Sequence, residues 1–211
     1  MKKIFAALAL SACVAAPASA VSYSFNCITN SNAANCAIGA AQLRVDVLQT
    51  PHANQALFQF YNTGLGASGI ADVYFDDGTL LSIAQINNST GVKFSQFAKP
   101  ANLPGANFAD PDFVTTAGFS ADSDAPVAKN AVNPGETLGI LFGLQPGQSF
   151  ADVVNAFSLG GAHGGLRIGL HVQSFANGGS ESFITSAVPE ASKLLMMLVG
   201  ILFIATRAMR R

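Results

Sequence analysis

The residues that could carry catalysis or bind a metal are few in this 211-residue chain, and they are widely spaced. The histidines His52, His163 and His171 show neither the H-x-x-x-H nor the H-E-x-x-H spacing with which a helix presents zinc ligands. No serine stands in a G-x-S-x-G elbow, which would expose it as a nucleophile. We therefore expect no catalytic residue, no metal, no cofactor and no enzymatic activity. All three histidines should lie at the surface or at a sheet edge, with His171 on the outward face of a strand.

Pairs of acidic residues occur at 76–77, 110–112 and 122–124, and exported β-rich domains can bind calcium through such loops. In the last pair, however, Pro126 fills a position where a calcium-binding EF-hand loop has Asp or Asn, and no glycine follows. Aspartates of this kind more often bond to their own backbone in turns. We expect turns here, and a flexible connection at the glycine-rich segment 160–165.

The middle of the chain predicts short strands separated by turn residues, with no long helical period. The Asp76-Asp77-Gly78-Thr79 segment favours a hairpin between two of these strands, because Asp-Gly pairs tolerate positive φ. The predicted strands are 43–47, 57–61, 70–75, 80–86, 92–97, 113–119, 137–144, 166–175 and 181–185.

One segment has a helical pattern. Phe150, Val153, Val154 and Phe157 are spaced i, i+3, i+4 and i+7, and Ser149 can cap the helix that they predict. The segments 98–112 and 120–136 contain prolines, glycines or aspartates and should be long loops. About nine strands in a domain of this size predict a mainly β fold, a single β-sandwich or jelly-roll-like domain with one short helix.

The net charge of −1 conceals an acidic middle. Between residues 21 and 187 there are five basic and eleven acidic residues, a net charge of −6. Scattered Lys and Arg in an acidic domain give no electrostatic footprint for nucleic acid, so we expect no nucleic-acid partner.

The N-terminus has the three parts of a secretion signal. Lys2 and Lys3 precede the apolar run 4–10, and Ala18 and Ala20 form a small-residue cleavage site. We expect residues 1–20 to be a signal peptide that is cleaved after Ala20.

Three cysteines are present. Leu10-Ser11-Ala12-Cys13 also fits a lipobox, and lipidation of Cys13 is the alternative to cleavage after Ala20. If the chain is cleaved after Ala20, as we expect, Cys13 is removed with the signal peptide, and the exported domain keeps Cys27 and Cys36. This pair predicts a disulfide.

The C-terminus carries an apolar run at 194–206, followed by Arg207, Arg210 and Arg211. A helix of that run reaches about 20 Å, short of the ~30 Å hydrocarbon core, so spanning requires Lys193 and the arginines to extend toward the interfaces. Positive residues stay on the cytoplasmic side, which places the domain outside.

Val188, Pro189, Glu190 and Ala191 stand just before this helix. The arrangement resembles the PEP-CTERM sorting signal of Gram-negative bacteria, in which a Pro-Glu-Pro motif precedes a short hydrophobic helix and terminal arginines. Pro189 and Glu190 match the first two motif positions, and Ala191 replaces the second proline. The resemblance covers 188–211 and implies that the tail anchors the chain transiently in the inner membrane, where an exosortase-type membrane enzyme recognises and cleaves it.

These features divide the chain into a signal peptide (1–20), a β-sandwich domain (21–187) and a sorting tail (188–211). They predict a non-enzymatic protein, exported across the inner membrane and delivered to the cell surface or to the extracellular polymeric matrix, with extracellular polysaccharide as a further partner. The alternative is a secreted domain that binds or hydrolyses carbohydrate, against which the absence of Trp counts.

Overall fold

Ten antiparallel strands form the framework of the computed structural model, which describes residues 19–186. Their apolar side chains mostly alternate with polar ones, so one face of each strand can be buried. In chain order the strands are β1 (Ala20–Cys27), β2 (Leu43–Gln49), β3 (Gln55–Asn62), β4 (Gly69–Asp76), β5 (Leu80–Asn88), β6 (Phe94–Gln96), β7 (Ser120–Ser123), β8 (Thr137–Leu144), β9 (Arg167–Gln173) and β10 (Glu181–Ser186).

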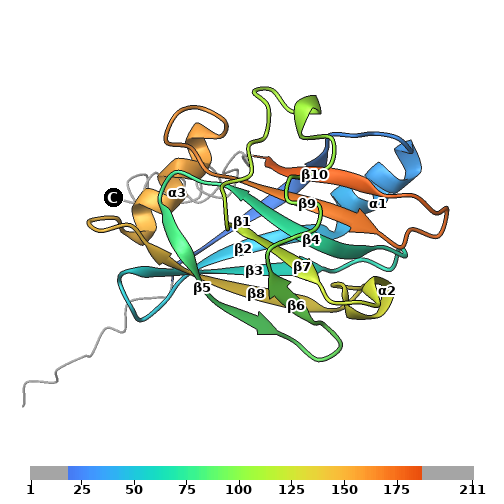
Figure 1. Cartoon of the computed structure of the whole chain (residues 1–211), viewed down its shortest axis with the longest axis horizontal. Helices are drawn as coiled ribbons and strands as arrows, with labels where there is room; N and C mark the ends of the chain where they lie inside the picture. The colour runs from blue at the N-terminus through green and yellow to red at the C-terminus, as the bar shows by residue number, and fades with distance from the viewer. Residues whose placement is uncertain (1–18, 187–211) are drawn as a thin grey trace, which may run out of the picture.

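All ten strands belong to one sheet with the order β5-β8-β3-β2-β1-β10-β9-β4-β7-β6. The sheet curls until its two edge strands meet (Figure 1). At that seam the side-chain amide of Asn88 takes the place of a strand backbone: it accepts from Phe94 N at 2.8 Å and donates to Phe94 O at 3.2 Å. The seam is therefore bridged at the Asn88 end of β5.

The core lies inside the curl. Phe75 of β4 meets Phe58 of β3 with ring centroids 5.4 Å apart, and Phe142 of β8 at 4.6 Å. Strands β2, β1, β10 and β9 separate β3 from β4 in the sheet, so these contacts form only because the sheet folds over on itself. All three rings are fully buried. Full burial of each is worth ~1.5–3 kcal/mol.

The helices lie at the periphery: α1 (Ala33–Gln42), η1 (Ala106–Phe108), α2 (Val127–Asn130) and α3 (Phe150–Leu159). Figure 1 places α3 at one end of the curled sheet and α1 at the opposite end. The helix predicted from Phe150 is confirmed as α3, with Val153 and Phe157 buried. The Ser149 N–H donates to Asp152 at 2.8 Å, as in a capping box.

The prediction of a mainly β domain is confirmed, and seven of the expected strands appear as β2, β3, β4, β5, β8, β9 and β10. The expected strand at 92–97 shortens to the three residues of β6. The long loop at 98–112 is also confirmed, apart from the single turn η1.

The hairpin predicted at 76–79 is wrong. Strand β4 pairs with β9 and β7, whereas β5 pairs with β8, so the Asp-Gly segment crosses between the two halves of the sheet. Gly78 serves a different purpose there: a Cβ on it would lie 2.4 Å from Gly164 O. Glycine is therefore required at this position because the backbone of Gly164 approaches it closely, and not because the chain makes a tight hairpin turn there.

Two further expectations need correction, and two elements were not expected. Residues 113–119 form no strand, and β7 lies in the expected loop 120–136. The structure adds β1, in which Tyr23 and Phe25 point into the core, although its alternation is visible in the sequence. It also adds α1, whose small side chains give little helical periodicity and which Asn32 caps by accepting from Ala34 N and Asn35 N.

The predicted sorting helix at 194–206 and the signal through residue 18 lie outside the described residues. Between residues 19 and 186, no helix has the length and apolar character needed to cross a membrane.

Candidate functional site

A disulfide joins Cys27 at the end of β1 to Cys36 in α1, as predicted. Their Cα atoms are 5.4 Å apart, within the usual range for a bridge. The bond ties the first helix to the sheet.

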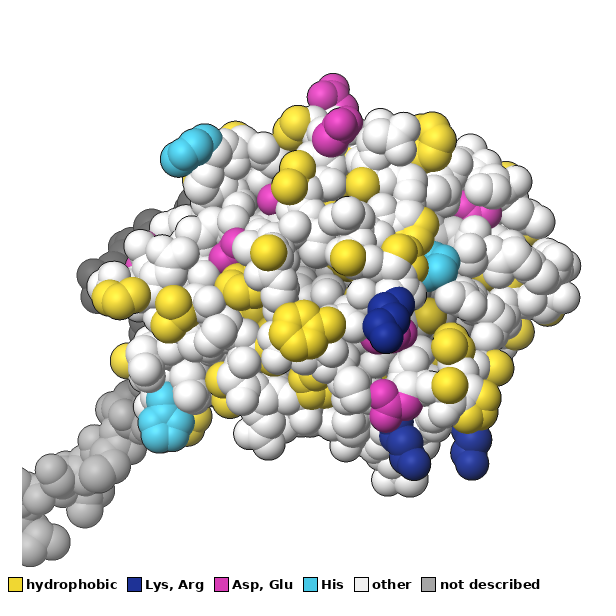
Figure 2. All heavy atoms as spheres, in the orientation of Figure 1, with side chains coloured by type: hydrophobic (Ala, Val, Ile, Leu, Met, Phe, Trp, Pro, Cys, Tyr) yellow, Lys and Arg dark blue, Asp and Glu magenta, His cyan; other side chains and the backbone are white. Residues whose placement is uncertain are grey.

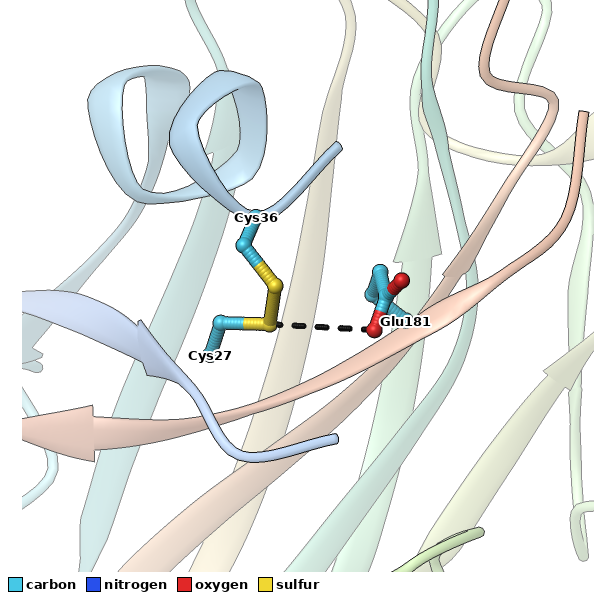
Figure 3. A group of neighbouring side chains, drawn as sticks. All are labelled: Cys27, Cys36 and Glu181. Atoms are coloured by element: carbon cyan, nitrogen blue, oxygen red, sulfur yellow. Dashed lines mark hydrogen bonds between the residues drawn. A yellow bond between two sulfur atoms is a disulfide. The ribbon is translucent and has the colours of Figure 1, made fainter. Parts of the chain in front are cut away.

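Beside the disulfide lies Glu181 of β10, a buried acid that the sequence did not single out (Figure 3). Its carboxylate accepts hydrogen bonds from the Thr29 hydroxyl, from Ser31 N at 3.0 Å and from Asn32 N at 2.6 Å. Such charge-assisted bonds compensate for burying the charge. Glu181 therefore fixes the loop that leads into α1 to a strand about 150 residues later in the sequence.

The Cys27 sulfur lies 3.8 Å from Glu181 Oε2, the contact drawn as a dashed line in Figure 3. In the disulfide this sulfur carries no proton, so the contact is not a hydrogen bond. The ligand atoms of Cys27, Cys36 and Glu181 lie within 4.8 Å of one another, close enough for a metal ion. Thiolates are the metal ligands, however, and a disulfide has none. With the bridge formed, the cluster is structural.

A second set of polar side chains runs across the strands on the face of the sheet opposite the core. Cross-strand register aligns one residue from each of five neighbouring strands: Ser182 of β10, His171 of β9, Asp72 of β4, Asp122 of β7 and Ser95 of β6. We call these five residues the polar row. It is the candidate functional site, because Ser182, His171 and Asp72 are buried, and buried polar side chains usually have a specific partner.

The centre of the row is an ion-pair geometry between His171 and Asp72. His171 Nδ1 lies 2.8 Å from Asp72 Oδ2, and the two side chains are only 11% and 3% exposed. His171 is on the outward face of its strand, as expected, but the expectation that it lies at the surface is wrong. His52 and His163 are exposed, as predicted.

Residues of the 98–113 loop cover part of this outer face. A Cβ on Gly169, two residues before His171 in β9, would touch Leu103 and Phe113 of that loop. The Tyr74 hydroxyl donates to Pro100 O at 3.0 Å. The second hydrophobic cluster, which the loop builds on the sheet, consists of Tyr74, Ala98, Leu103, Ala109 and Phe113.

Arg167 fastens the same loop. Its guanidinium bonds Asp76 Oδ2 with an Nε distance of 3.1 Å, and it donates to Pro111 O and Asp112 O at 2.6 Å each. The Arg167 side chain is 6% exposed, and its charged end lies 5.4 Å from the Phe113 ring centroid. Of the predicted acidic fragments at 76–77 and 110–112, this anchor uses the Asp76 carboxylate and the backbone carbonyls of Pro111 and Asp112.

Asp72 and Asp122 face each other on β4 and β7. Burial, the hydrogen bond with Asp72 and the charges of Asp72 and Asp124 raise the pKa of Asp122 to about 6, while Lys99 acts in the opposite direction. Asp72 Oδ1 is buried, and no N–H or hydroxyl group of residues 19–186 reaches it. A hydrogen bond between two carboxyl groups needs a proton on one of them, so Asp72 and Asp122 can bond to each other only when the pair holds a proton.

Burial, followed by the negative charges of Asp72 and Asp122, also raises the pKa of Tyr74 above its usual range. The tyrosine therefore stays neutral and acts as a hydrogen-bond donor. Figure 2 shows no continuous patch of either charge on the face that it presents, and basic side chains lie beside acidic ones at its lower right.

The order Ser182, His171, Asp72 is that of a nucleophile, a base and an orienting acid. The arrangement is not an assembled catalytic triad, because Ser182 is fully buried and its hydroxyl has no hydrogen-bond partner within residues 19–186. What the row can do chemically is hold a proton between Asp72 and Asp122.

The remaining predicted site residues are not part of either cluster. Ala20 opens β1, so cleavage after it would leave Val21 as the first residue of that strand. Outside the described residues lie the cleavage residue Ala18, the sorting motif Val188, Pro189 and Glu190, and the topology-setting Lys193, Arg207, Arg210 and Arg211.

Comparison of the chain with protein-family models, with curated proteins and with solved structures gives no match in any of the three.

Proposed function

We propose that this protein is a non-enzymatic component of the cell surface or the extracellular polymeric matrix, exported by its N-terminal signal and sorted by a PEP-CTERM-like tail. The observation that carries the proposal is the disulfide between Cys27 and Cys36. Disulfides persist in oxidising compartments and are rare in the cytosol. The disulfide lies beside the buried, hydrogen-bonded Glu181 and is part of the folded core of this region, which supports folding in an oxidising compartment after export.

The position of the ten strands along the chain fits the same proposal. Strand β1 begins at Ala20, at the proposed cleavage site, and β10 ends at Ser186, just before the motif at Val188. The ten strands that the structure describes all lie between Ala20 and Ser186, ahead of the proposed tail. We further propose that this single curled sheet, folded over on its core, is the β-sandwich or jelly-roll-like domain expected from the sequence.

The alternative, a domain that hydrolyses carbohydrate, gains no support from the polar row. Glycosidase carboxyl pairs stand about 5–10 Å apart so that the sugar, and in inverting enzymes a water, fits between them. Asp72 and Asp122 are register partners on neighbouring strands, where opposite Cβ atoms are only about 4.5–5.5 Å apart, and Asp72 is buried. Polysaccharide remains a proposed partner in the matrix, without an assigned contact surface.

Processing of the tail tests the proposal. In a host that has the exosortase-type enzyme, the wild-type chain should appear at the surface or in the medium without its tail. The double variant Pro189→Ala/Glu190→Ala should accumulate uncleaved in the inner membrane. Ala191→Pro completes the family motif and serves as the matched control, which should be processed at least as well as the wild type. Equal surface delivery of the double variant and the wild type would overturn the sorting proposal.

A further inference from the structure

Strand β7 is the narrow attachment of one edge of the sheet. It has four residues and three register pairs with β4, and β6 is bound to the sheet through β7 and the Asn88 bridge. The loop over the polar row also depends on β7, because Phe97 N donates to Ser120 O at 2.8 Å and Ala98 N donates to Ser120 Oγ at 3.0 Å. Release of β7 would therefore loosen both the edge and the start of the covering loop.

We propose that Asp72, Asp122 and His171 form a pH-operated latch, in which a proton shared by the two aspartates holds β7 against β4 and its loss loosens the β6–β7 edge. The position of Asp72 supports the proposal. The residue is 2% exposed, its Oδ2 contacts His171, and its Oδ1 has no hydrogen-bond partner among residues 19–186. A proton shared with Asp122, its register partner on β7, would give this buried carboxyl group a further hydrogen bond. Without that proton two negative charges stand directly opposite each other on neighbouring strands, which is destabilising.

The groups around the pair set the direction of the response. His171 and Gln173 approach from β9, the neutral Tyr74 from β4, Asp124 from the end of β7, Ser95 from β6 and Lys99 from the covering loop. The pKa of Asp122 is raised in the folded protein from 3.8 to about 6, so the folded state binds the proton more tightly than the open state does. Local stability from this proton is thus fully present below about pH 4 and is lost as the pH rises to about 6.

Hydrogen exchange at the β7 amides, corrected for intrinsic rates, measures the latch directly. One pKa unit corresponds to a tenfold change in an equilibrium, and the partial exposure of Asp122 reduces the effect of the full shift. In the wild type we expect protection of β7 to fall about tenfold between about pH 4 and about pH 7. Asp122→Asn, whose amide can donate to Asp72 at every pH, should abolish this fall. Asp110→Asn is the matched control, an exposed aspartate that is not among the groups that shift the pKa of Asp122, and it should behave like the wild type.

Two results would overturn the latch: protection of β7 that does not change with pH in the wild type, or the same fall in Asp122→Asn as in the wild type. The proposal is also overturned if millimolar Ca²⁺ or Zn²⁺ restores the protection of β7 at neutral pH in the wild type but not in Asp122→Asn. That result would show that the two aspartates hold a metal ion and not a shared proton. If the variant does not fold, a carboxyl-carbon NMR titration of the wild type decides the matter. A midpoint for Asp122 at its ordinary value of 3.8 would then overturn the proposal.

Discussion

Substituting Glu181 by Gln changes one atom of a fully buried carboxylate and should cost much of the stability of the domain. Three donors point at the two carboxylate oxygens: the Thr29 hydroxyl and Ser31 N–H at Oε2, and Asn32 N–H at Oε1. In glutamine one oxygen becomes an NH₂ group, which has no lone pair to offer. The hydroxyl can rotate and accept instead, but a backbone N–H cannot.

In either orientation of the glutamine amide, then, one backbone N–H at the entrance to α1 faces another donor. A buried donor left without an acceptor costs about 1–3 kcal/mol, and the bonds that remain lose their charge assistance. We expect Glu181→Gln to lower the free energy of unfolding by about 3 kcal/mol. Urea unfolding followed by circular dichroism, with the disulfide kept oxidised, measures this difference.

Glu136→Gln is the matched control. Glu136 is only partly buried, and its carboxylate accepts from the backbone N–H of Asn133 at 2.8 Å. It should lose less than about 1 kcal/mol, because water can satisfy the groups that the substitution leaves unpaired. If Glu181→Gln is no more destabilising than Glu136→Gln, the carboxylate does not hold α1 to the sheet, and the reasoning is refuted.

Three more substitutions probe the other contacts that hold the fold. The double variant Cys27→Ser/Cys36→Ser opens a loop whose ends are 9 residues apart and should lose about 2.7 kcal/mol in urea unfolding, whereas a loss near zero would contradict a structural bridge. Arg167→Met removes the donor that serves the carbonyls of Pro111 and Asp112 and the carboxylate of Asp76. We expect the free energy of unfolding to fall by about 3 kcal/mol and the 98–113 loop to be cleaved faster by a protease. An unchanged rate of proteolysis would contradict the role of Arg167 as an anchor. Gly78→Ala should lower the free energy of unfolding, measured by thermal unfolding, by about 1–3 kcal/mol, because the new Cβ meets a backbone carbonyl. Gly143→Ala is the control and should have a much smaller effect, because nothing lies within 4 Å of its Cβ. Equal effects of the two substitutions would refute the steric argument.

Local patterns in the sequence predicted most of the elements because each pattern needs only its own residues. Alternation identified strands such as β2, and the spacing of Phe150, Val153 and Phe157 identified α3. Pairing between strands is a different matter, since it depends on how the whole sheet closes. The Asp-Gly segment at 77–78 has the composition of a hairpin, yet the strands on either side of it pair with partners elsewhere in the chain.

The polar row was missed for the same reason. His171 and Asp72 are 99 residues apart, and only the register of β4 with β9 brings them together. A signal was nevertheless present: Asp72 stands within the apolar run Ile70–Phe75, and His171 stands between Leu170 and Val172. A titratable residue flanked by apolar residues in a buried strand needs a buried partner, and looking for that partner would have paired these two. Glu181, at the start of β10 beside a turn, carries no comparable mark in the sequence.

Mass spectrometry of the protein purified from its own host tests the central claim most directly, because it reads both termini and the state of the cysteines in one sample. We predict a surface or extracellular form that begins at Val21, ends close to the Pro189-Glu190 motif and lacks two hydrogens because Cys27 and Cys36 are joined. A protein that still runs from Met1 to Arg211, with both thiols free, would contradict export, sorting and oxidation together.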